Sequence, residues 1–301
     1  MYRQHFGLKE SPFRLTPDTA FYYAYPDHQE ALNVLNVALR MGEGFLKVTG
    51  EVGTGKTLLC RRLLNSLDDG FSTAYIPNPC LTPASLRHAL AEELGVKSYR
   101  NMSQEQVVGL INERLIEQVQ AGQKVVVVLD EAQAMPDKTL EALRLLTNLE
   151  TEKSKLLHVV LFGQPELDAR LAQPHLRQLR QRITFSYHLH PMSEEGVVGY
   201  IDHRLRVSGY NGPTPFTRRA VKKLYRTSRG IPRLVNVLAH KSLLSAFGQG
   251  KRIVEPRHVA MAVADTEDAN AGPFTGWRLW FGLAGTLTSI FSISAALLLR
   301  G

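Results

Sequence analysis

The eight residues from Gly50 to Thr57 constrain this chain more than any other stretch. Their sequence, GEVGTGKT, fits the pattern G-x-x-x-x-G-K-[S/T], in which backbone N–H groups surround the phosphates of a nucleotide. An apolar run over 45–49 precedes the loop and a helix-forming run over 58–67 follows it, which is the strand–loop–helix context that such a loop requires. A chance glycine-rich turn would leave both the complete octet and its context unexplained.

Each residue type that this pattern specifies has a chemical reason. Gly53 and Gly55 would let the backbone approach phosphate closely, because glycine has no side chain to obstruct it. Lys56 would place a positive charge at the β and γ oxygens, and Thr57 would offer a hydroxyl to Mg²⁺. We therefore expect ATP and Mg²⁺ as cofactors.

A second chemical signal is a pair of carboxylates directly after a buried strand. The run KVVVVL over 124–129 is typical of a central parallel strand covered on both faces, and Asp130 and Glu131 follow it. Asp130 could orient Mg²⁺ through its waters, and Glu131 could polarise an attacking water as general base. Two acidic residues placed at a helix start by the helix dipole are the alternative. Combined with the phosphate loop, the pair favours nucleotide hydrolysis.

These two signals define the expected binding residues. Thr57 and Asp130 are the expected metal-binding residues. The expected nucleotide-binding residues are Gly50, Glu51, Val52, Gly53, Thr54, Gly55, Lys56, Thr57, Leu58 and Asp130.

Three further kinds of polar residue are candidates for catalysis. Gln164, after an apolar run at 156–162, could bond the γ-phosphate or the water, or be an ordinary polar turn residue. Arg180 or Arg182 could reach a phosphate held by a neighbouring subunit, or lie on a solvated helix face. Arg233, at the start of a later helix, could respond to the γ-phosphate, or lie on the surface. The expected catalytic residues are Lys56, Glu131, Gln164, Arg180, Arg182 and Arg233.

The order of predicted elements indicates the fold class. Strands expected at 45–49, 72–76, 124–129 and 156–162 alternate with helices, which predicts an α/β fold with a doubly wound parallel sheet. Asp27 is expected to cap a helix from His28 to Met41. After residue 190 only helices are expected, at 194–207, 217–227, 232–247 and 256–263, which predicts a C-terminal helical lid. The expected organisation is a lead-in packed on the ATPase core (1–27), a nucleotide-binding domain (28–190), the lid (191–264), a linker (265–276) and a transmembrane helix (277–299).

Composition adds little to this assignment. The net charge is +8, but the basic residues are spread along the chain without a long run, so a solvated surface is the simplest interpretation. The two cysteines, Cys60 and Cys80, lack zinc-site spacing, and Cys60 is expected to pack as a small apolar residue behind the phosphate loop.

The last part of the sequence predicts a membrane span. Residues 279–299 carry no charge, and about 20 apolar residues suffice to cross a bilayer. Aromatic and basic residues precede the stretch, as at a membrane interface. A buried core helix is the alternative. The flanking charges give no orientation, but ATP is cytosolic, so we expect a single-pass protein of the bacterial inner membrane with a cytoplasmic ATPase domain. A stripe of small residues could pack on another membrane helix, or face lipid: Gly285, Ser289, Ser292 and Ala296.

The motifs, in their order, resemble those of the AAA+ ATPases of the general secretion pathway protein A family. The resemblance covers about residues 1–265 and is carried by HFGLKESPFRLTPD, GEVGTGKT, LDEAQ, LFGQPEL, LRQRI and GIPRLVN. It implies a P-loop AAA+ fold with the usual roles: Walker A for Lys56 and Thr57, Walker B for Asp130 and Glu131, sensors for Gln164 and Arg233, and an arginine finger at Arg180 or Arg182.

The family resemblance also implies partners. The secretion proteins carry a periplasmic peptidoglycan-binding domain after their membrane helix, which we do not expect here because the sequence ends at Gly301. The chain therefore looks more like the short ATPases of mannose-sensitive haemagglutinin (MSHA) type IV pilus biogenesis. We expect a homo-oligomer, either a ring or an ATP-dependent dimer, that works at the membrane with inner-membrane pilus or secretion assembly proteins.

The sequence is also compatible with two alternative functions. A DNA-associated ATPase resembling transposition regulators would suit the basic charge, although the predicted span argues against nucleic acid as a partner. A nucleotide-dependent scaffold would use ATP binding without turnover.

Overall fold

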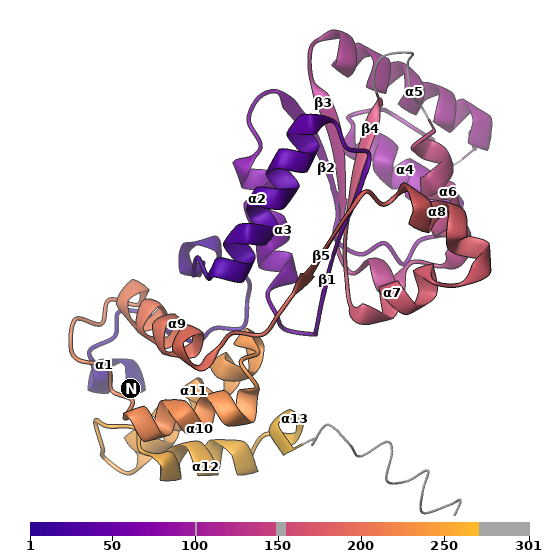
Figure 1. The fold of residues 1–301 in the computed structure, drawn as a ribbon. Helices are drawn as coiled ribbons and strands as arrows, with labels where there is room; N and C mark the ends of the chain where they lie inside the picture. Colours follow the sequence, from indigo (N-terminus) through magenta and orange to yellow (C-terminus); the bar gives the residue numbers. More distant parts are fainter. Residues whose placement is uncertain (100, 149–154, 271–301) are drawn as a thin grey trace, which may run out of the picture.

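The computed structural model describes residues 1–99, 101–148 and 155–270. Figure 1 shows two parts, a sheet with helices on both faces and a smaller group of helices beside one end of the strands.

The larger part is built on five parallel strands in the order β2-β3-β4-β1-β5. This arrangement confirms the predicted parallel sheet. Because β1 lies between β4 and β5, the loop that follows β1 lies beside the carboxyl ends of both neighbours. The strands are β1 (Phe45–Gly50), β2 (Phe71–Ile76), β3 (Lys124–Leu129), β4 (Leu157–Gly163) and β5 (Phe185–Leu189).

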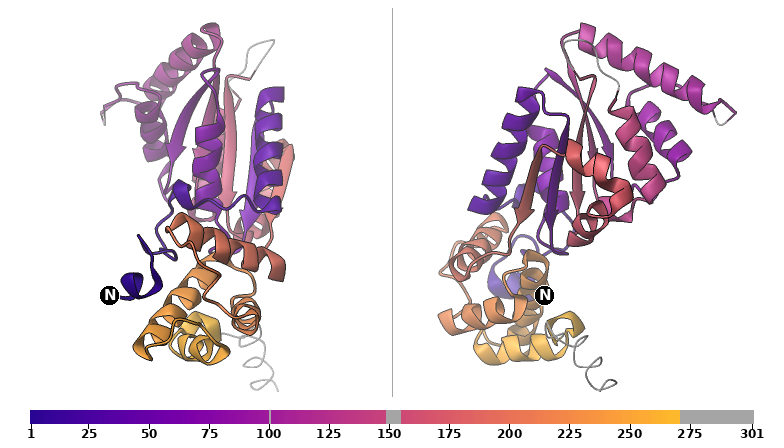
Figure 2. Two further views of the ribbon diagram at one scale, coloured as in Figure 1. Left: turned by 90° about the vertical axis from the view of Figure 1, so that its left-hand side faces the viewer. Right: turned by 45° about the vertical axis from the view of Figure 1, so that its right-hand side comes forward.

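Strand β3 explains the unbroken valine run of the sequence. Successive side chains of a strand point to opposite faces, so Val126 and Val128 pack in one hydrophobic cluster while Val125 and Val127 pack in the other. The first cluster lies under α2 (Pro26–Met41) and α3 (Lys56–Ser66). The second lies under α4 (Pro83–Glu93), α5 (Gln104–Gln120), α6 (Asp137–Leu146), α7 (Pro165–Leu171) and α8 (Arg177–Arg182). Both faces of the sheet are therefore covered, as Figure 2 shows.

The smaller part has its own hydrophobic core, formed by helices from the last third of the described chain. They are α9 (Glu194–Val207), α10 (Arg218–Ser228), α11 (Pro232–Gly248), α12 (Pro256–Ala264) and α13 (Glu267–Asn270). We call this part the lid. Helical structure continues to Asn270, within the expected linker of 265–276.

The N-terminal segment corrects one expectation. It contains α1 (Tyr2–Phe6) and the short helix Thr19–Phe21, and its buried side chains Phe6, Leu8 and Phe13 belong to the lid core rather than to the core of the sheet. Only its later part reaches the α/β part, where the Arg61 guanidinium on α3 donates to the carbonyl of Pro17 at 2.9 Å. Residues 1–27 therefore bridge the two parts instead of packing on the ATPase core.

The start of α2 differs from the prediction as well. Pro26 occupies the first turn and Tyr25 is the N-cap residue, so Asp27 lies inside the helix and does not cap it. Its carboxylate instead accepts hydrogen bonds from the backbone N–H of His190 at 3.0 Å and from the Tyr187 hydroxyl at 3.2 Å. Asp27 therefore does not cap its own helix but contacts β5 and the residue that follows it, at the start of the connection to the lid.

The predicted span at 277–299 and its stripe of small residues lie outside the described residues. Within the described part of the chain, no helix has both the length and the apolar character to cross a membrane.

Candidate nucleotide-binding site

The loop between β1 and α3 has the backbone shape that its glycines permit. Gly53 and Gly55 have φ angles of +83° and +100°, a region that residues with a side chain rarely adopt. Thr54 closes the turn, since its hydroxyl donates to the Glu51 carbonyl at 2.8 Å. The loop leads into the N-terminus of α3, where the helix dipole favours anions.

Lys56 lies inside this loop and is only 5% exposed. Its ammonium group donates to the carbonyls of Gly50 at 2.8 Å and Glu51 at 2.9 Å. Burial lowers its pKa, and the nearby carboxylates of Glu131 and Asp130 act in the opposite direction. The site therefore holds a buried cation next to two acidic side chains, and a polyphosphate could supply the negative charge that this cation pairs with.

Asp130 follows β3 and is buried, with 2% exposure. Burial raises the pKa of its carboxyl, while hydrogen bonds from Thr57 and from the backbone N–H of Glu131 oppose this shift. The hydroxyl of Thr57 and the carboxylate of Asp130 are thus neighbours. Hydroxyl and carboxylate oxygens are hard ligands that suit Mg²⁺. Mg²⁺ in nucleotide sites commonly keeps several waters and binds phosphate oxygens, so these two side chains would complete its coordination.

Glu131 is held by two amide side chains. Its Oε2 atom accepts from Nε2 of Gln133 at 2.5 Å and from Nε2 of Gln164 at 3.1 Å. Gln133 in turn accepts the backbone N–H of Gln164 at 3.0 Å, which closes a triangle between the end of β3 and the end of β4. Glu131 itself has φ +54°, a left-handed conformation that is uncommon for a residue with a side chain. We call these three residues the amide–carboxylate triangle.

Gln133 was not among the residues predicted for the site. It lies two positions after Glu131, on a short 3₁₀ helix (Ala132–Ala134) that was not expected. The sequence does contain a signal for it, because an amide residue two positions after Glu131 can fold back and donate to that carboxylate.

Arg233, at the start of α11, brings the lid to the phosphate loop. Its backbone N–H donates to the Gly53 carbonyl at 3.2 Å, and a Cβ atom at Gly53 would lie 2.6 Å from the Cβ of Arg233. Glycine at position 53 is therefore needed for this close approach as well as for its φ angle. The exposed Arg233 side chain lines the same cleft as Lys56 and Glu131.

The other two predicted arginines lie elsewhere. Arg180 is exposed on α8. Arg182 donates to the Thr147 hydroxyl at 3.1 Å, at the end of α6, and it precedes β5 at the amino edge of the sheet. The phosphate loop lies at the carboxyl edge. The structure thus brings neither arginine to the phosphate loop of its own chain.

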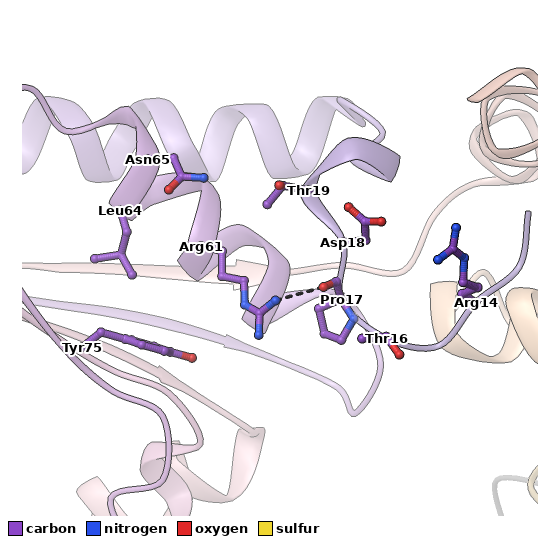
Figure 3. A pocket seen from close by; sticks show the side chains of 9 residues that line it. All are labelled: Arg14, Thr16, Pro17, Asp18, Thr19, Arg61, Leu64, Asn65 and Tyr75. Atoms are coloured by element: carbon purple, nitrogen blue, oxygen red, sulfur yellow. Dashed lines mark hydrogen bonds between the residues drawn. The ribbon is translucent and has the colours of Figure 1, made fainter. Parts of the chain in front are cut away.

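The cleft over the phosphate loop has walls from three parts of the chain. Its lining includes the loop, the lid residues Tyr200, Arg204 and Asn236, and residues 14–18 of the N-terminal segment. A second hollow, drawn in Figure 3, shares residues 14 and 16–18 and extends along α3 to Tyr75 of β2. Arg204 is 5% exposed and fixes the N-terminal wall, because its guanidinium donates to the carbonyls of Pro12 at 2.5 Å and Arg14 at 3.1 Å. None of the wall residues from the lid or from residues 14–18 was predicted for the site from the sequence.

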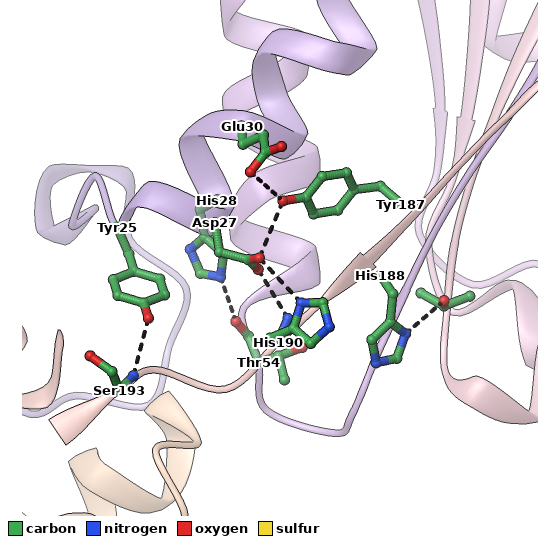
Figure 4. A network of polar contacts seen from close by, with 10 residues as sticks. Tyr25, Asp27, His28, Glu30, Thr54, Tyr187, His188, His190 and Ser193 are labelled. Atoms are coloured by element: carbon green, nitrogen blue, oxygen red, sulfur yellow. Dashed lines mark hydrogen bonds and ion pairs between the residues drawn. The ribbon is translucent and has the colours of Figure 1, made fainter.

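A polar network supports the loop from the side of α2 (Figure 4). Nε2 of His28 lies 2.9 Å from the carbonyl of Thr54, and burial lowers the pKa of His28, so the neutral ring donates this hydrogen bond. The first residues of α2 and its N-cap residue contact the segment between β5 and α9. Asp27 accepts the backbone N–H of His190, and the Tyr25 hydroxyl accepts the backbone N–H of Ser193 at 3.1 Å. The start of α2 therefore touches both the phosphate loop and the connection to the lid.

Comparison with known proteins agrees with this geometry. A family profile described as "AAA domain" matches residues 39–171, which contain β1 to α7. Over 287 residues the chain is 42% identical to general secretion pathway protein A of Aeromonas hydrophila, and the match covers 95% of this chain. The chain belongs to this family of AAA ATPases. It spans about half of its relative, 52% of the length. The closer likeness to the MSHA pilus ATPases stays a prediction.

Solved structures show the same fold at low sequence identity. Cdc6p from Pyrobaculum aerophilum has a TM-score of 0.64 and 18% identity, with 82% of this chain and 70% of that chain covered. The Aeropyrum pernix ORC2 protein, described as ADPNP–ADP complexes, has a TM-score of 0.61 and 14% identity, with coverage of 88% and 74%. The RuvB Holliday junction branch migration motor of Thermotoga maritima has a TM-score of 0.56 and 14% identity, with coverage of 83% and 73%. At these identities the similarity shows that the fold is shared, and it carries no conclusion about partners.

Proposed function

We propose that this protein is a membrane-anchored ATPase whose hydrolysis of Mg²⁺-ATP drives assembly of a type IV pilus or a type II secretion complex. The observation that carries the ATPase part is that Lys56, Thr57, Glu131 and Gln164 line one cleft, with the buried Asp130 carboxylate beside Thr57 and Lys56. The family relationship supports a secretion-related role.

The proposed chemistry assigns one task to each group. Lys56 and the loop N–H groups would bind the β- and γ-phosphates, and Thr57 and Asp130 would hold Mg²⁺, which supplies charge neutralisation when bound. Glu131 would take a proton from water as the water oxygen bonds to the γ-phosphorus and the bond to the β-phosphate oxygen breaks, giving ADP and phosphate. The two amides on Oε2 would fix the direction in which the carboxylate accepts that proton.

The proposed assembly is a homo-oligomer. Arg180 is exposed and distant from its own loop, so it could act only on a phosphate held by a neighbouring copy, and the same holds for Arg182 if its contact with Thr147 opens. Arg233 would respond to the γ-phosphate within its own chain, because its backbone already contacts Gly53.

Nucleotide binding tests the first half of this proposal. Lys56→Ala should weaken ATP binding roughly 10- to 100-fold, since a hydrogen bond to a charged group contributes about 1.5–3 kcal/mol. Lys97→Ala is the matched control, because Lys97 is an exposed lysine of the α/β part away from the cleft, and it should bind ATP normally. Equal ATP affinity in the two variants would refute the assignment of Lys56.

Membrane fractionation tests the anchor. The full-length protein should sediment with membranes, resist extraction by high salt, and dissolve in detergent. Recovery in the soluble fraction would remove the membrane part of the proposal and favour the DNA-associated alternative.

A further inference from the structure

The net positive charge of the chain is concentrated in the lid. Residues 208–254 contain ten Lys and Arg and no Asp or Glu, whereas the net charge of the whole chain is +8. Half of them lie within nine consecutive residues, 218–226, which form most of a single helix, α10 (Arg218–Ser228).

Helix α10 has two sharply different faces. Ala220, Val221 and Leu224 are buried in the lid core. The opposite arc carries five basic residues, of which four are exposed and Lys223 is half-buried. Within the described part of the chain, none of these five side chains forms an ion pair with a carboxylate. The five are Arg218, Arg219, Lys222, Lys223 and Arg226.

A neighbouring loop extends this surface. Val254 pairs with the residues just before α10, donating to the Pro215 carbonyl at 2.7 Å and accepting from the Thr217 N–H at 3.0 Å. The exposed residues Lys251 and Arg252 therefore lie close to the start of α10, and Ile253 beside them is 57% exposed. We call the five residues of α10, together with Lys251 and Arg252, the basic face.

We propose that the basic face docks on a phospholipid surface that carries anionic headgroups. Basic side chains near such a surface are attracted to it, and an exposed apolar residue among them suits the boundary between headgroups and acyl chains. The choice of a lipid partner rests on the membrane anchor of the proposed function.

The length of chain after the lid favours lipid over other polyanions. In the lid, α10 packs against α12, and α12 packs against α13. Figure 1 shows these three helices together at the end of the molecule away from the sheet. Eight residues, 271–278, separate Asn270 from the uncharged stretch. Fully extended, they reach at most about 30 Å. A bilayer entered at residue 279 would thus hold the lid within reach of its headgroups, whereas duplex DNA would have no such tether.

Lysine acylation in nanodiscs tests the proposal on the full-length protein. The protein is reconstituted in discs of phosphatidylcholine alone or with a third phosphatidylglycerol, and the acylation rate of Lys222 is compared with that of exposed Lys97 and Lys138 in the same sample. We expect Lys222 to react about fivefold more slowly in the anionic discs. The difference should vanish in high salt, and the two reference lysines should not change.

A pair of variants separates the basic face from total charge. Arg219→Glu with Arg226→Glu reverses two exposed positions on either side of Lys222 and should abolish its protection. Arg40→Glu with Arg177→Glu makes the same change in charge at two exposed positions of the α/β part, leaves the reference lysines in place and should keep the protection. Circular dichroism checks that both variants are folded.

The outcomes are distinct. Failure of the protein to enter either disc would contradict the proposed anchor. Entry into both discs with equal acylation of Lys222 would overturn the docking proposal alone. Protection by added duplex DNA without protection by phosphatidylglycerol would also overturn it, and would identify nucleic acid as the partner of the basic face.

Discussion

His28 is predicted to stabilise the phosphate loop through one hydrogen bond from a helix outside the loop. Its Nε2 atom lies 2.9 Å from the carbonyl of Thr54, and both residues are buried, with exposures of 8% and 1%. His28→Ala would leave a buried carbonyl without its donor, at a cost of about 1–3 kcal/mol. Because the lost contact holds the loop itself, we also expect ATP affinity to fall by roughly tenfold, the equivalent of about 1.4 kcal/mol.

Two control variants make this prediction specific. His28→Gln keeps an N–H group near the position of Nε2 and should recover most of both losses. His158 is the matched buried histidine, because it is 3% exposed and its Nδ1 atom lies 2.8 Å from the Glu43 carbonyl, at the opposite edge of the sheet. His158→Ala should lower stability by a similar amount and leave ATP affinity unchanged.

Urea unfolding followed by circular dichroism gives the stability of each variant, and fluorescence titration with a labelled ATP analogue gives the affinity. If His28→Ala and His158→Ala affect ATP affinity equally, the specific support of the loop by His28 is refuted. If His28→Ala changes neither quantity, the hydrogen bond to Thr54 has no energetic role.

Two further predictions concern pH and the triangle. Burial lowers the pKa of five histidines below 6.5, so near and below pH 6.5 the unfolded chain binds more protons than the folded one, and the free energy of unfolding should fall as the pH drops from 7.5 to 5.5. The raised pKa of Asp130 acts in the opposite direction but is a single group. A urea midpoint that stays constant or rises over this pH range would contradict the expectation. The five histidines are His28, His158, His203, His240 and His258. Gln133→Ala removes one of the two amides that donate to the Glu131 carboxylate. Because this amide positions the carboxylate, the variant should turn ATP over about tenfold more slowly with little change in ATP affinity. A steady-state assay that finds only a weaker affinity would show that Gln133 acts on binding instead.

Elements whose cause is local were predictable. β3 occupies 124–129 as expected, because a run of β-branched residues buried on both faces has few other solutions. α5 begins with a capping box of the kind that a serine followed three residues later by a glutamine indicates, and the Ser103 and Gln106 side chains each accept the other's backbone N–H. Cys60 is buried as a small apolar residue, also as expected.

Features that depend on distant contacts were not predictable in this way. The N-terminal segment packs on the lid because a buried arginine of α9, Arg204, binds the carbonyls of Pro12 and Arg14, almost two hundred residues away. The sequence predicts that Asp27 caps a helix, but the helix begins at Pro26, and the Asp27 carboxylate accepts hydrogen bonds from Tyr187 and His190. The basic face was missed because apolar residues interrupt its basic residues at 218–226 and the helix turns these onto one side, while Lys251 and Arg252 join them only through the pairing of Val254 with Phe216.

The candidate site shows the same division. The loop and the acidic pair were placed by their sequence patterns, and the structure brings Gln164 and Arg233 to them. Arg180 and Arg182 stay outside the site of their own chain, since Arg180 is exposed on α8 and Arg182 contacts Thr147, so their action on a neighbouring subunit stays a proposal.

The central claim is that Glu131 converts a nucleotide-binding loop into an ATPase site, and phosphate release tests it most directly. With saturating Mg²⁺-ATP, Glu131→Gln should bind the nucleotide with near-normal affinity and turn it over about 10²- to 10⁴-fold more slowly than the unmodified protein. Glu113→Gln, at an exposed carboxylate of α5 outside the cleft, is the matched control and should hydrolyse ATP at the normal rate. Normal phosphate release by Glu131→Gln would contradict the account.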